Sequence, residues 1–275
     1  MTDRYAVIGN PIGHTKSPMI HRAIAEQTDQ DLEYTAILGT VGGFGDDVAA
    51  FRDEGGRGLN ITAPFKLDAF RYATKLQEGA TLAGAVNCLS FDGDEATGAN
   101  FDGVGLTRDI QRNLGFPLRG KRVLLLGAGG AARGALLPFL EQRPAELVLV
   151  NRTVAKANAL GEQFASYGTL VTTGYEELAQ ERGQYDIVVN ATSASLQDEL
   201  PPVSASVFGH GCLAYELLYG KGLTPFLRLA KNAGVQHVAD GVGMLVEQAA
   251  EAFEWWRGVR LDTAPMIKQL TVPLD

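Results

Sequence analysis

The sequence predicts a two-domain α/β protein, with a mixed sheet in the N-terminal part and a doubly wound parallel sheet in the C-terminal part. Apolar strands alternate with amphipathic helices along the 275 residues, a spacing typical of parallel βαβ units. In the first part, the turn DGDE (92–95) joins two strand-like runs and predicts a hairpin. The Gly/Pro/basic stretch GFPLRGKR (115–122) separates the two parts and is the candidate linker.

Nine elements besides the loops are expected up to the linker. Strands are predicted over 5–9, 32–38 and 58–62, and the hairpin strands over 85–91 and 96–101. The helix over 17–27 opens with Ser17 as a cap and Pro18 at the first helical position, and the helix over 64–73 also opens with a proline. Further helices are predicted over 41–54 and 102–114.

The second part repeats the alternation after the linker. Strands are predicted over 123–127, 146–150, 169–173, 185–192 and 212–219, and helices over 131–142, 153–167, 175–181 and 224–234. The tail 240–258 carries apolar residues at helical spacing. From this pattern alone, the tail helix either closes the second domain or returns to the first.

Composition and charge exclude several classes of protein. The net charge is −8 and no basic stripe is present, so we expect no nucleic-acid partner. Cys88 and Cys212 lack CxxC spacing, which predicts no disulfide scaffold and no metal site and favours a reducing compartment. The N-terminus does not resemble a signal peptide, and no apolar run approaches the roughly 18 residues of a membrane span. We therefore expect a cytoplasmic protein without membrane contact.

The turn GAGGAA (127–132) indicates a dinucleotide site of the Rossmann type. It follows an apolar strand, opens a helix and fits G-x-G-x-x-A, with Ala132 at the third position. Gly127 would supply the tight turn and Gly129 would let the backbone approach a pyrophosphate at the helix N-terminus. Plain tight turns use the same glycines, so the motif by itself leaves that alternative open.

The end of the second strand indicates which dinucleotide is bound. NAD enzymes place Asp or Glu there to accept from the ribose 2′-OH, whereas this strand ends in Asn151-Arg152-Thr153. Arg152 would pair with a 2′-phosphate that a carboxylate would repel. Thr153 can cap the next helix and offer its hydroxyl, and Lys156 adds a second cation. These residues predict NADP; the alternative is that Arg152 and Lys156 form a solvated surface pair.

Polar residues gather where the strands of the first part end, which is where α/β sheets bind ligands. A lysine and an aspartate beside hydroxyls and amides suit a polyol substrate and a proton transfer. The set comprises Thr15, Ser17, Thr62, Lys66, Asn87, Asn100 and Asp102.

Eight motifs in order, from Gly9 to Gln248, resemble those of the shikimate dehydrogenase family. They are GNPIxHxKSP, NxTxPFK, AGAVN, NxDG, GAGGA, NRT, NAT and DGxGMLxxQAA, and they cover nearly the whole chain. The resemblance implies an N-terminal substrate domain and a C-terminal Rossmann NADP-binding domain, with the last helices returning to the first domain. The implied ranges are 1–101 plus 239–275 for the substrate domain and 102–238 for the Rossmann domain.

The resemblance also implies an activity and a set of site residues. The family interconverts shikimate and 3-dehydroshikimate with NADP, in the shikimate pathway of aromatic amino acid biosynthesis. Lys66 and Asp102 match the catalytic pair. The substrate positions would be Thr15, Ser17 and Tyr215 for the carboxylate, and Thr62, Asn87 and Gln248 for the ring hydroxyls or the carboxylate region. The cofactor positions would be Gly127, Ala128, Gly129, Gly130, Ala131, Asn151, Arg152, Thr153, Lys156, Thr192, Leu217 and Gly241.

The proposed chemistry requires the catalytic pair to act together. A proton must leave the alcohol oxygen as hydride leaves its carbon, and an ordinary lysine, with a pKa of about 10.4, is poorly matched to this task at neutral pH. We therefore expect Lys66 and Asp102 to titrate as one unit and to shuttle the proton. The alternative is an ordinary ion pair at the domain edge. The partner would be a small-molecule acid, and the protein is expected to be a monomer or homodimer.

Several positions depart from the usual family pattern. Thr15 stands for serine, Cys88 and Phe101 for threonine, Ala99 for aspartate, and Glu216 for aspartate. The large ring of Phe101 directly precedes Asp102 and can shrink or dry the pocket. Losing two hydroxyls favours a divergent paralogue, which would still be a dehydrogenase. Slower turnover of shikimate, or a preference for quinate or a related cyclohexene or cyclohexane carboxylate, is the alternative to a standard shikimate dehydrogenase.

Two other classes of protein are less favoured by the motifs. A non-catalytic sensor of such acids would not need Lys66, Asp102 and the NADP residues together. Another two-domain NADP enzyme, such as a methylenetetrahydrofolate dehydrogenase, would carry a different motif set in its substrate domain. Outside the motifs, His21 is interpreted as a packing or surface residue, Trp255 and Trp256 as packing residues, and Glu247 as a solvated side chain.

Overall fold

The computed structural model describes residues 2–180 and 183–274, which form two compact units. Unit 1 comprises the chain up to Gly105 together with Val246–Met266, and unit 2 comprises Leu106–Leu245 and the chain from Ile267 onward. The chain passes between the units inside three helices: α5 (Asp102–Arg108), α10 (Val242–Arg257) and α11 (Ala264–Leu270). Because a continuous helix shows no break in its pattern, the sequence-derived ranges differ from this division by several residues.

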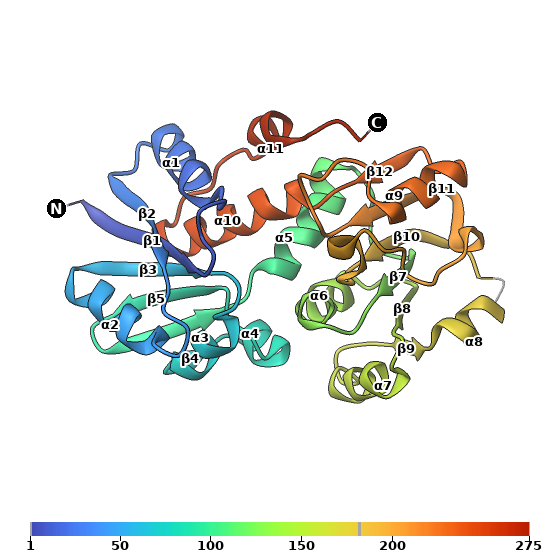
Figure 1. The fold of residues 1–275 in the computed structure, drawn as a ribbon, viewed down its shortest axis with the longest axis horizontal. Coiled ribbons are helices and arrows are strands. Elements are labelled where there is room, and N and C mark those ends of the chain that lie inside the picture. The colour runs from blue at the N-terminus through green and yellow to red at the C-terminus, as the bar shows by residue number, and fades with distance from the viewer. Residues whose placement is uncertain (1, 181–182, 275) are drawn as a thin grey trace. The chain divides into compact units, whose positions relative to one another are not determined.

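Unit 1 contains a mixed six-stranded sheet in the order β2-β1-β3-β5-β6-β4 (Figure 1). Strands β1, β2 and β3 are parallel, whereas β5 is antiparallel to both β3 and β6. The predicted hairpin and the mixed sheet are therefore confirmed. The strands are β1 (Asp3–Gly9), β2 (Leu32–Leu38), β3 (Gly56–Ile61), β4 (Lys75–Leu76), β5 (Cys88–Asp92) and β6 (Glu95–Ala99).

The helices of unit 1 bury one face each. In α1 (Ser17–Gln27) the buried residues Ser17, Ile20, His21 and Ile24 follow the helical repeat, so this helix packs one stripe inward. The N-cap is Lys16 rather than the predicted Ser17, so Pro18 is the second helical residue, still within the first turn where proline is tolerated. The other helices before α5 are α2 (Phe44–Asp53), α3 (Lys66–Tyr72) and α4 (Glu78–Ala83). The sequence pattern missed α4 because six residues are too few to show a repeat.

Unit 2 contains a parallel six-stranded sheet in the order β12-β11-β10-β7-β8-β9. Counted from the first strand of the unit, this is the Rossmann strand order. β7 and β10 are parallel neighbours, and the order in which strands are added reverses between them. The strands are β7 (Arg122–Leu126), β8 (Glu146–Val150), β9 (Leu170–Thr173), β10 (Tyr185–Asn190), β11 (Phe208–Glu216) and β12 (His237–Ala239).

The helices of unit 2 follow the strands as the alternation predicts. They are α6 (Gly130–Glu141), α7 (Val154–Gln163), α8 (Tyr175–Gln180) and α9 (Pro225–Asn232), with three short turns, η1 (Asp109–Asn113), η2 (Ala194–Gln197) and η3 (Ala205–Val207). The last residue predicted for α8, Glu181, lies outside the described residues. The described part of the chain contains no helix with the length and apolar character that crossing a membrane requires.

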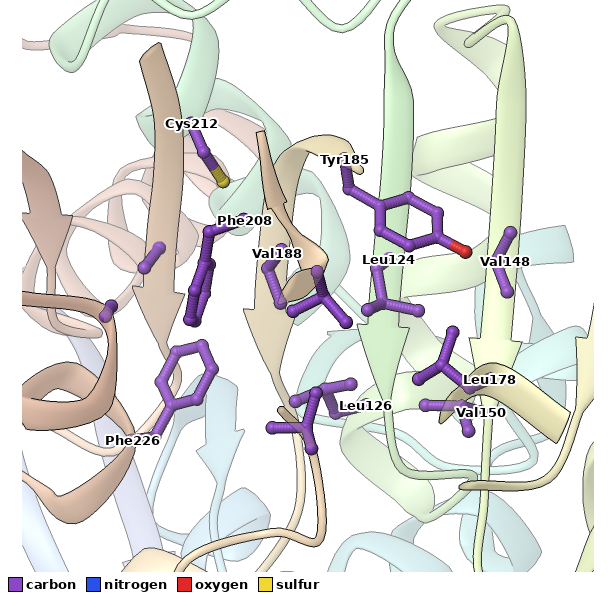
Figure 2. Packing of buried hydrophobic residues seen from close by; sticks show 14 of the residues in the cluster. Leu124, Leu126, Val148, Val150, Leu178, Tyr185, Val188, Phe208, Cys212 and Phe226 are labelled. Carbon is purple, nitrogen blue, oxygen red and sulfur yellow. The ribbon is translucent and has the colours of Figure 1, made fainter. Parts of the chain in front are cut away.

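The core of unit 2 forms on the sheet itself. Leu124 and Leu126 of β7 and Val148 of β8 are buried beside Val188 of β10, as Figure 2 shows. Phe226 of α9 joins this cluster, its ring centroid 6.0 Å from that of Phe208. Strands buried in this way read as continuous apolar runs, which is why the sequence identified them. The packed sheet fixes the positions of the loops at its strand ends.

Glu247, expected to be solvated, is instead buried in an ion-pair cluster of unit 1. The Arg260 guanidinium lies 2.7 Å from the Glu247 carboxylate and 2.6 Å from those of Glu251 and Glu254. Thr263 also donates to Glu247. The cluster fastens the segment after α10 to the helix that carries Gln248. A local sequence pattern does not reveal that Glu247 pairs with Arg260, because the two residues are thirteen positions apart.

His21 is a packing residue, one of the two roles the sequence suggested. Its ring is fully buried and stacks on Tyr34, with centroids 4.1 Å apart and an interplanar angle of 5°. Phe253 and Trp256 also lie against the ring. Burial lowers the pKa of His21 to about 3 and outweighs the opposing effect of the Asn60 side chain. The imidazole is therefore neutral in the folded protein near neutral pH.

The Arg260 cluster predicts a large effect on the stability of unit 1. Arg260→Ala leaves the buried Glu247 carboxylate without its cation, so we expect the free energy of unfolding to fall by about 3 kcal/mol. Urea unfolding followed by tryptophan fluorescence measures this, since both tryptophans lie in α10 of unit 1.

Arg71→Ala is the matched control for this variant. Arg71 pairs with Asp68 on an exposed helix surface of the same unit, so its loss should change the free energy of unfolding by less than about 0.5 kcal/mol. Equal effects of the two substitutions would contradict a structural role for the Arg260 cluster.

The buried histidine predicts that unit 1 loses stability in mild acid. The unfolded chain binds a proton near pH 6.5, whereas folded His21 binds one only near pH 3. Its contribution is therefore complete above pH 6.5 and declines as the pH falls below that value, by about 2 kcal/mol between pH 6.5 and 5. Urea unfolding at both pH values should show this extra loss in the wild type and not in His21→Phe. Parallel pH profiles of the two proteins would refute the prediction.

Candidate functional site

Lys66 and Asp102 form an ion pair in unit 1. The Lys66 Nζ lies 2.5 Å from the Asp102 Oδ2, and Asn87 donates from its Nδ2 to the Asp102 Oδ1 at 2.8 Å. Lys66 begins α3 and Asp102 begins α5. The Lys66 side chain is 35% exposed and that of Asp102 17%. Both carboxylate oxygens thus have partners, while the ammonium keeps contact with solvent and can meet a ligand.

Two asparagines hold the backbone beside this pair. The Asn87 Oδ1 accepts from the Phe101 N–H at 2.9 Å, and the Asn100 Oδ1 accepts from the Asp102 N–H at 3.1 Å. Asn100 also donates to the carbonyl of Ala85 at 3.1 Å. Asn87 is buried and both ends of its amide are engaged. The structure therefore gives Asn87 a positioning role beside Asp102, in addition to the substrate contact predicted for it.

The other predicted substrate residues of unit 1 lie on loops and helices near strand ends. Thr15 donates to the Ser17 Oγ at 3.2 Å, and the Ser17 N–H donates back to the Thr15 Oγ1 at 3.3 Å, which pairs the two hydroxyls. Thr62 directly follows β3, and its N–H bonds the Ile8 carbonyl of β1. Gln248 is half-buried on α10.

Three departures from the family pattern gather in one apolar cluster of unit 1. Cys88 and Ala99 are fully buried together with Ala252 of α10. The ring of Phe101 lies edge-on to Trp255, with centroids 5.6 Å apart. The substitutions at 88 and 99 therefore change a packed core, and the ring at 101 packs against α10. The structure thus gives these three departures a packing role, and the substrate preference inferred from them stays a prediction.

Unit 2 contains a cavity of about 650 Å³ at the carboxyl ends of β7, β8 and β10. Ten of the predicted cofactor residues line it, and Leu217 and Gly241 do not. No sequence signal pointed to the remaining wall, which includes Tyr175 and the loop residues beyond Thr192. The predicted lining residues are Gly127, Ala128, Gly129, Gly130, Ala131, Asn151, Arg152, Thr153, Lys156 and Thr192.

The glycine-rich turn has the geometry that the motif implies. Gly127 has φ of +101°, and a Cβ there would lie 3.1 Å from the Thr192 side chain and 3.2 Å from the Ala191 carbonyl. A Cβ at Gly129 or Gly130 would meet nothing within 4 Å, so the backbone at the start of α6 faces open space. An anion can approach these N–H groups and the positive end of the helix.

The end of β8 presents cations to the same cavity. Arg152, Thr153 and Lys156 are exposed. Asn151 accepts from the Ala128 N–H at 3.2 Å and donates to the Thr153 carbonyl at 2.9 Å, so its amide holds the loop. Thr153 occupies the N-cap position of α7 but makes no side-chain cap, contrary to the expectation, which leaves its hydroxyl outside the helix. The arrangement suits a phosphate group.

Tyr175 is a cavity residue that the sequence pattern did not reveal. It begins α8 and lines the cavity together with Arg152. Burial raises the pKa of its phenol to about 12, and the charge of Arg152 opposes this only in part. The side chain is therefore neutral and offers the cavity an aromatic surface.

The two predicted cofactor residues outside the cavity meet at the ends of β11 and β12. A Cβ on Gly241 would lie 2.1 Å from the Leu217 carbonyl oxygen, so only glycine permits this approach. Leu217 in turn bonds the Asn190 carbonyl of β10 through its N–H at 3.1 Å. These contacts connect the loops after three parallel strands.

Tyr215 is placed differently from the expected substrate residue. It is fully buried in unit 2, donates to the Asp109 Oδ2 at 2.7 Å and accepts from the Met244 N–H at 3.3 Å. Burial, together with the nearby Asp109 charge, raises the pKa of Tyr215 well above its usual range. Four residues on, Tyr219 is 40% exposed beyond the end of β11. The pattern YELLY does not distinguish the two tyrosines, and the structure makes Tyr219 the accessible one.

The described residues contain no group of three or more His, Cys, Asp or Glu side chains arranged to hold a metal ion. Unit 1 offers an ion pair with adjacent amides and hydroxyls, and unit 2 offers a cavity that suits an anion.

Comparison with known proteins identifies related domains along the chain. Residues 7–89 match the shikimate dehydrogenase substrate binding domain, residues 109–197 match the shikimate / quinate 5-dehydrogenase domain, and residues 241–271 match the shikimate 5′-dehydrogenase C-terminal domain.

Full-length relatives agree with these matches. The chain is 54% identical to the shikimate dehydrogenase (NADP(+)) of Nitrosospira multiformis, over 98% of both chains. It is 59% identical to an Ael1 enzyme from Pseudomonas putida, with a TM-score of 0.95 and complete coverage of both chains. It is 30% identical to the shikimate 5-dehydrogenase of Thermus thermophilus in complex with NADP(H) and shikimate, with a TM-score of 0.84 over 97% of this chain and 98% of that one. This chain belongs to the shikimate dehydrogenase family.

Proposed function

We propose that this chain is an NADP-dependent oxidoreductase that reversibly oxidises shikimate to 3-dehydroshikimate, with unit 1 binding the substrate and unit 2 the cofactor. The observation that carries the proposal is the Lys66–Asp102 ion pair, whose Nζ and Oδ2 atoms lie 2.5 Å apart at the starts of α3 and α5 in unit 1. Relatives named shikimate dehydrogenase (NADP(+)) that align along nearly the full length support it.

The cavity of unit 2 fits NADP. The open backbone at Gly129 and Gly130 suits a pyrophosphate at the N-terminus of α6. Arg152 and Lys156 would hold the 2′-phosphate, and the strand end carries an amide where an NAD enzyme carries a carboxylate. When bound, the cofactor accepts or supplies the hydride.

The proton transfer falls to the pair in unit 1. In the reductive direction the Lys66 ammonium would donate a hydrogen bond to the substrate carbonyl and release its proton as that oxygen gains charge. In the oxidative direction the pair takes the proton from the alcohol. Asp102 holds the ammonium in place, and Asn87 holds the carboxylate through the Oδ1 that Lys66 does not use.

The remaining contacts orient an acid with ring hydroxyls. The paired hydroxyls of Thr15 and Ser17 would bind the substrate carboxylate, and Thr62 and Gln248 would contact the ring hydroxyls or the same carboxylate. The packing of Cys88 and Phe101 in the apolar cluster leaves shikimate favoured over quinate. The cytoplasmic location and the monomeric or homodimeric state stay predictions.

Loss of the lysine should abolish turnover without abolishing binding. Wild-type protein should reduce NADP⁺ with shikimate, read as absorbance at 340 nm, and Lys66→Ala should lower kcat by about 10²–10⁴-fold because the proton acceptor is gone. The KM for shikimate should change by no more than a few-fold.

Lys75→Ala is the control for this variant. Lys75 belongs to the same unit but pairs with Glu95 on the surface, so both kinetic constants should stay at wild-type values. If turnover in Lys66→Ala stays within a few-fold of wild type, the pair is not the proton shuttle. Turnover of quinate in preference to shikimate would reassign the substrate, and tight binding of the acids without any turnover would favour the sensor.

The exposed arginine at the end of β8 should determine the choice of cofactor. Arg152→Ala removes a charge-assisted contact to the 2′-phosphate, so the KM for NADP⁺ should rise at least about tenfold while the KM for NAD⁺ barely changes. Arg119→Ala serves as control, because Arg119 is an exposed arginine of unit 2 outside the cavity. Equal losses with both cofactors in Arg152→Ala would show that the residue does not read the phosphate.

A further inference from the structure

Glu216 is a buried carboxylate that the proposed reaction does not use. It is the last residue of β11, is fully buried and stands where the family usually has aspartate. Four donors surround it: the Asn190 Nδ2 at 2.9 Å, the Ser195 Oγ at 2.6 Å, the Thr224 Oγ1 at 3.2 Å and the Leu218 N–H at 3.2 Å. A group this deeply buried is tolerated when its hydrogen bonds are satisfied, and here both oxygens are engaged.

The carboxylate ties together the loops that follow β10 and β11. Ser195 belongs to η2 and lies inside the segment that lines the cofactor cavity, between Ala194 and Leu196. Asn190 donates to Glu216, and its Oδ1 accepts from both the N–H and the Oγ1 of Thr192, at 3.1 and 2.7 Å. Leu218 fixes the first turn after β11. One side chain therefore sets the position of the cavity wall at 192–197.

The partners of Glu216 fit an ionised carboxylate. The Asn190 Nδ2 and the Leu218 N–H can only donate, and a carboxylate accepts from both of them and from the two hydroxyls without donating. Burial raises the pKa of Glu216, while the hydrogen bonds from Ser195 and Asn190 act against that rise. Glutamine in its place would bring an NH₂ group against at least one of these donors.

The two halves of a Rossmann sheet bind different halves of a dinucleotide. Arg152 and Lys156 follow β8 and belong to the adenylate half, whereas β10 and β11 belong to the other mononucleotide half. The wall held by Glu216 therefore faces the nicotinamide half of the cofactor. We propose that Glu216 is a positioning residue that holds the 192–197 loop for the nicotinamide half of NADP through Asn190 and Ser195.

This inference rests on the proposed function and can be tested apart from it. Calorimetric titrations with NADP⁺ and with adenosine 2′,5′-bisphosphate, which is the adenylate half alone, separate the two halves of the site. In Glu216→Gln the Kd for NADP⁺ should rise at least about tenfold, because the loop loses its anchor, while the Kd for the bisphosphate should stay within about twofold. Glu216→Asp keeps the charge and should recover most of the NADP⁺ affinity.

Two further variants keep the test decisive if Glu216→Gln folds poorly. Ser195→Ala removes the loop end of the network and keeps the buried charge, so it should weaken NADP⁺ selectively and by a smaller factor. Asp186→Asn removes an anchor at the opposite end of β10, where Asp186 accepts from Lys121 and the Arg122 N–H, and should leave both Kd values unchanged.

The outcomes separate failure of the positioning role of Glu216 from failure of the proposed function. Equal weakening of both ligands, or unchanged NADP⁺ affinity, in Glu216→Gln and Ser195→Ala would overturn the positioning role. Failure of the wild-type protein to bind NADP⁺ would instead overturn the proposed function itself.

Discussion

Parallel strand pairing is the constraint from which both candidate sites follow. Parallel strands end at one edge of a sheet, so the loops after them meet there. In unit 1 the loops after β1 and β3 are joined by a hydrogen bond from the Asn10 N–H to the Ala63 carbonyl, and Lys66 follows directly. In unit 2 the loops after β7, β8 and β10 surround the cavity. Residues far apart in the sequence thereby reach one place without any local signal that joins them.

At these edges, buried polar groups act as supports and exposed ones remain for ligands. Asn87 binds Asp102, and Asn190 binds Glu216, in each case an amide holding a carboxylate at a strand end or helix start. Such groups are costly to bury without partners, so their mutual bonds fix the local geometry. The Lys66 ammonium and the cations after β8 keep solvent contact instead. The polar groups that support the loops are thus buried, whereas the groups left for ligands keep contact with solvent.

The sequence predicted what is local and missed what depends on distant partners. Apolar runs, capping prolines and the glycine turn located nearly all strands and long helices, because each signal lies within its own element. The burial of Tyr215 depends on Asp109, and that of Glu247 on Arg260, so no local pattern revealed either. The short elements α4 and β12 carry too few residues for a repeat. Polar residues at strand ends suggested Lys66 and Asp102, but their pairing was assigned through the motif resemblance, since they stand 36 residues apart.

The departures from the family pattern separate in space from the residues that are retained. Cys88 and Ala99 are directly paired across β5 and β6, and with Phe101 they pack against α10. Asn87 and Asp102 alternate with them along the chain and bond to each other. The apolar contacts and the Asn87–Asp102 bond involve different side chains, so the cluster can be repacked while that bond is kept. Polar residues at 88, 99 and 101 would each need a partner in the cluster, and exchanging all three for apolar ones removes that need at once. The three departures therefore sit in packed positions, and the Lys66–Asp102 pair keeps the hydrogen bonds of Asn87 and Asn100 that hold Asp102.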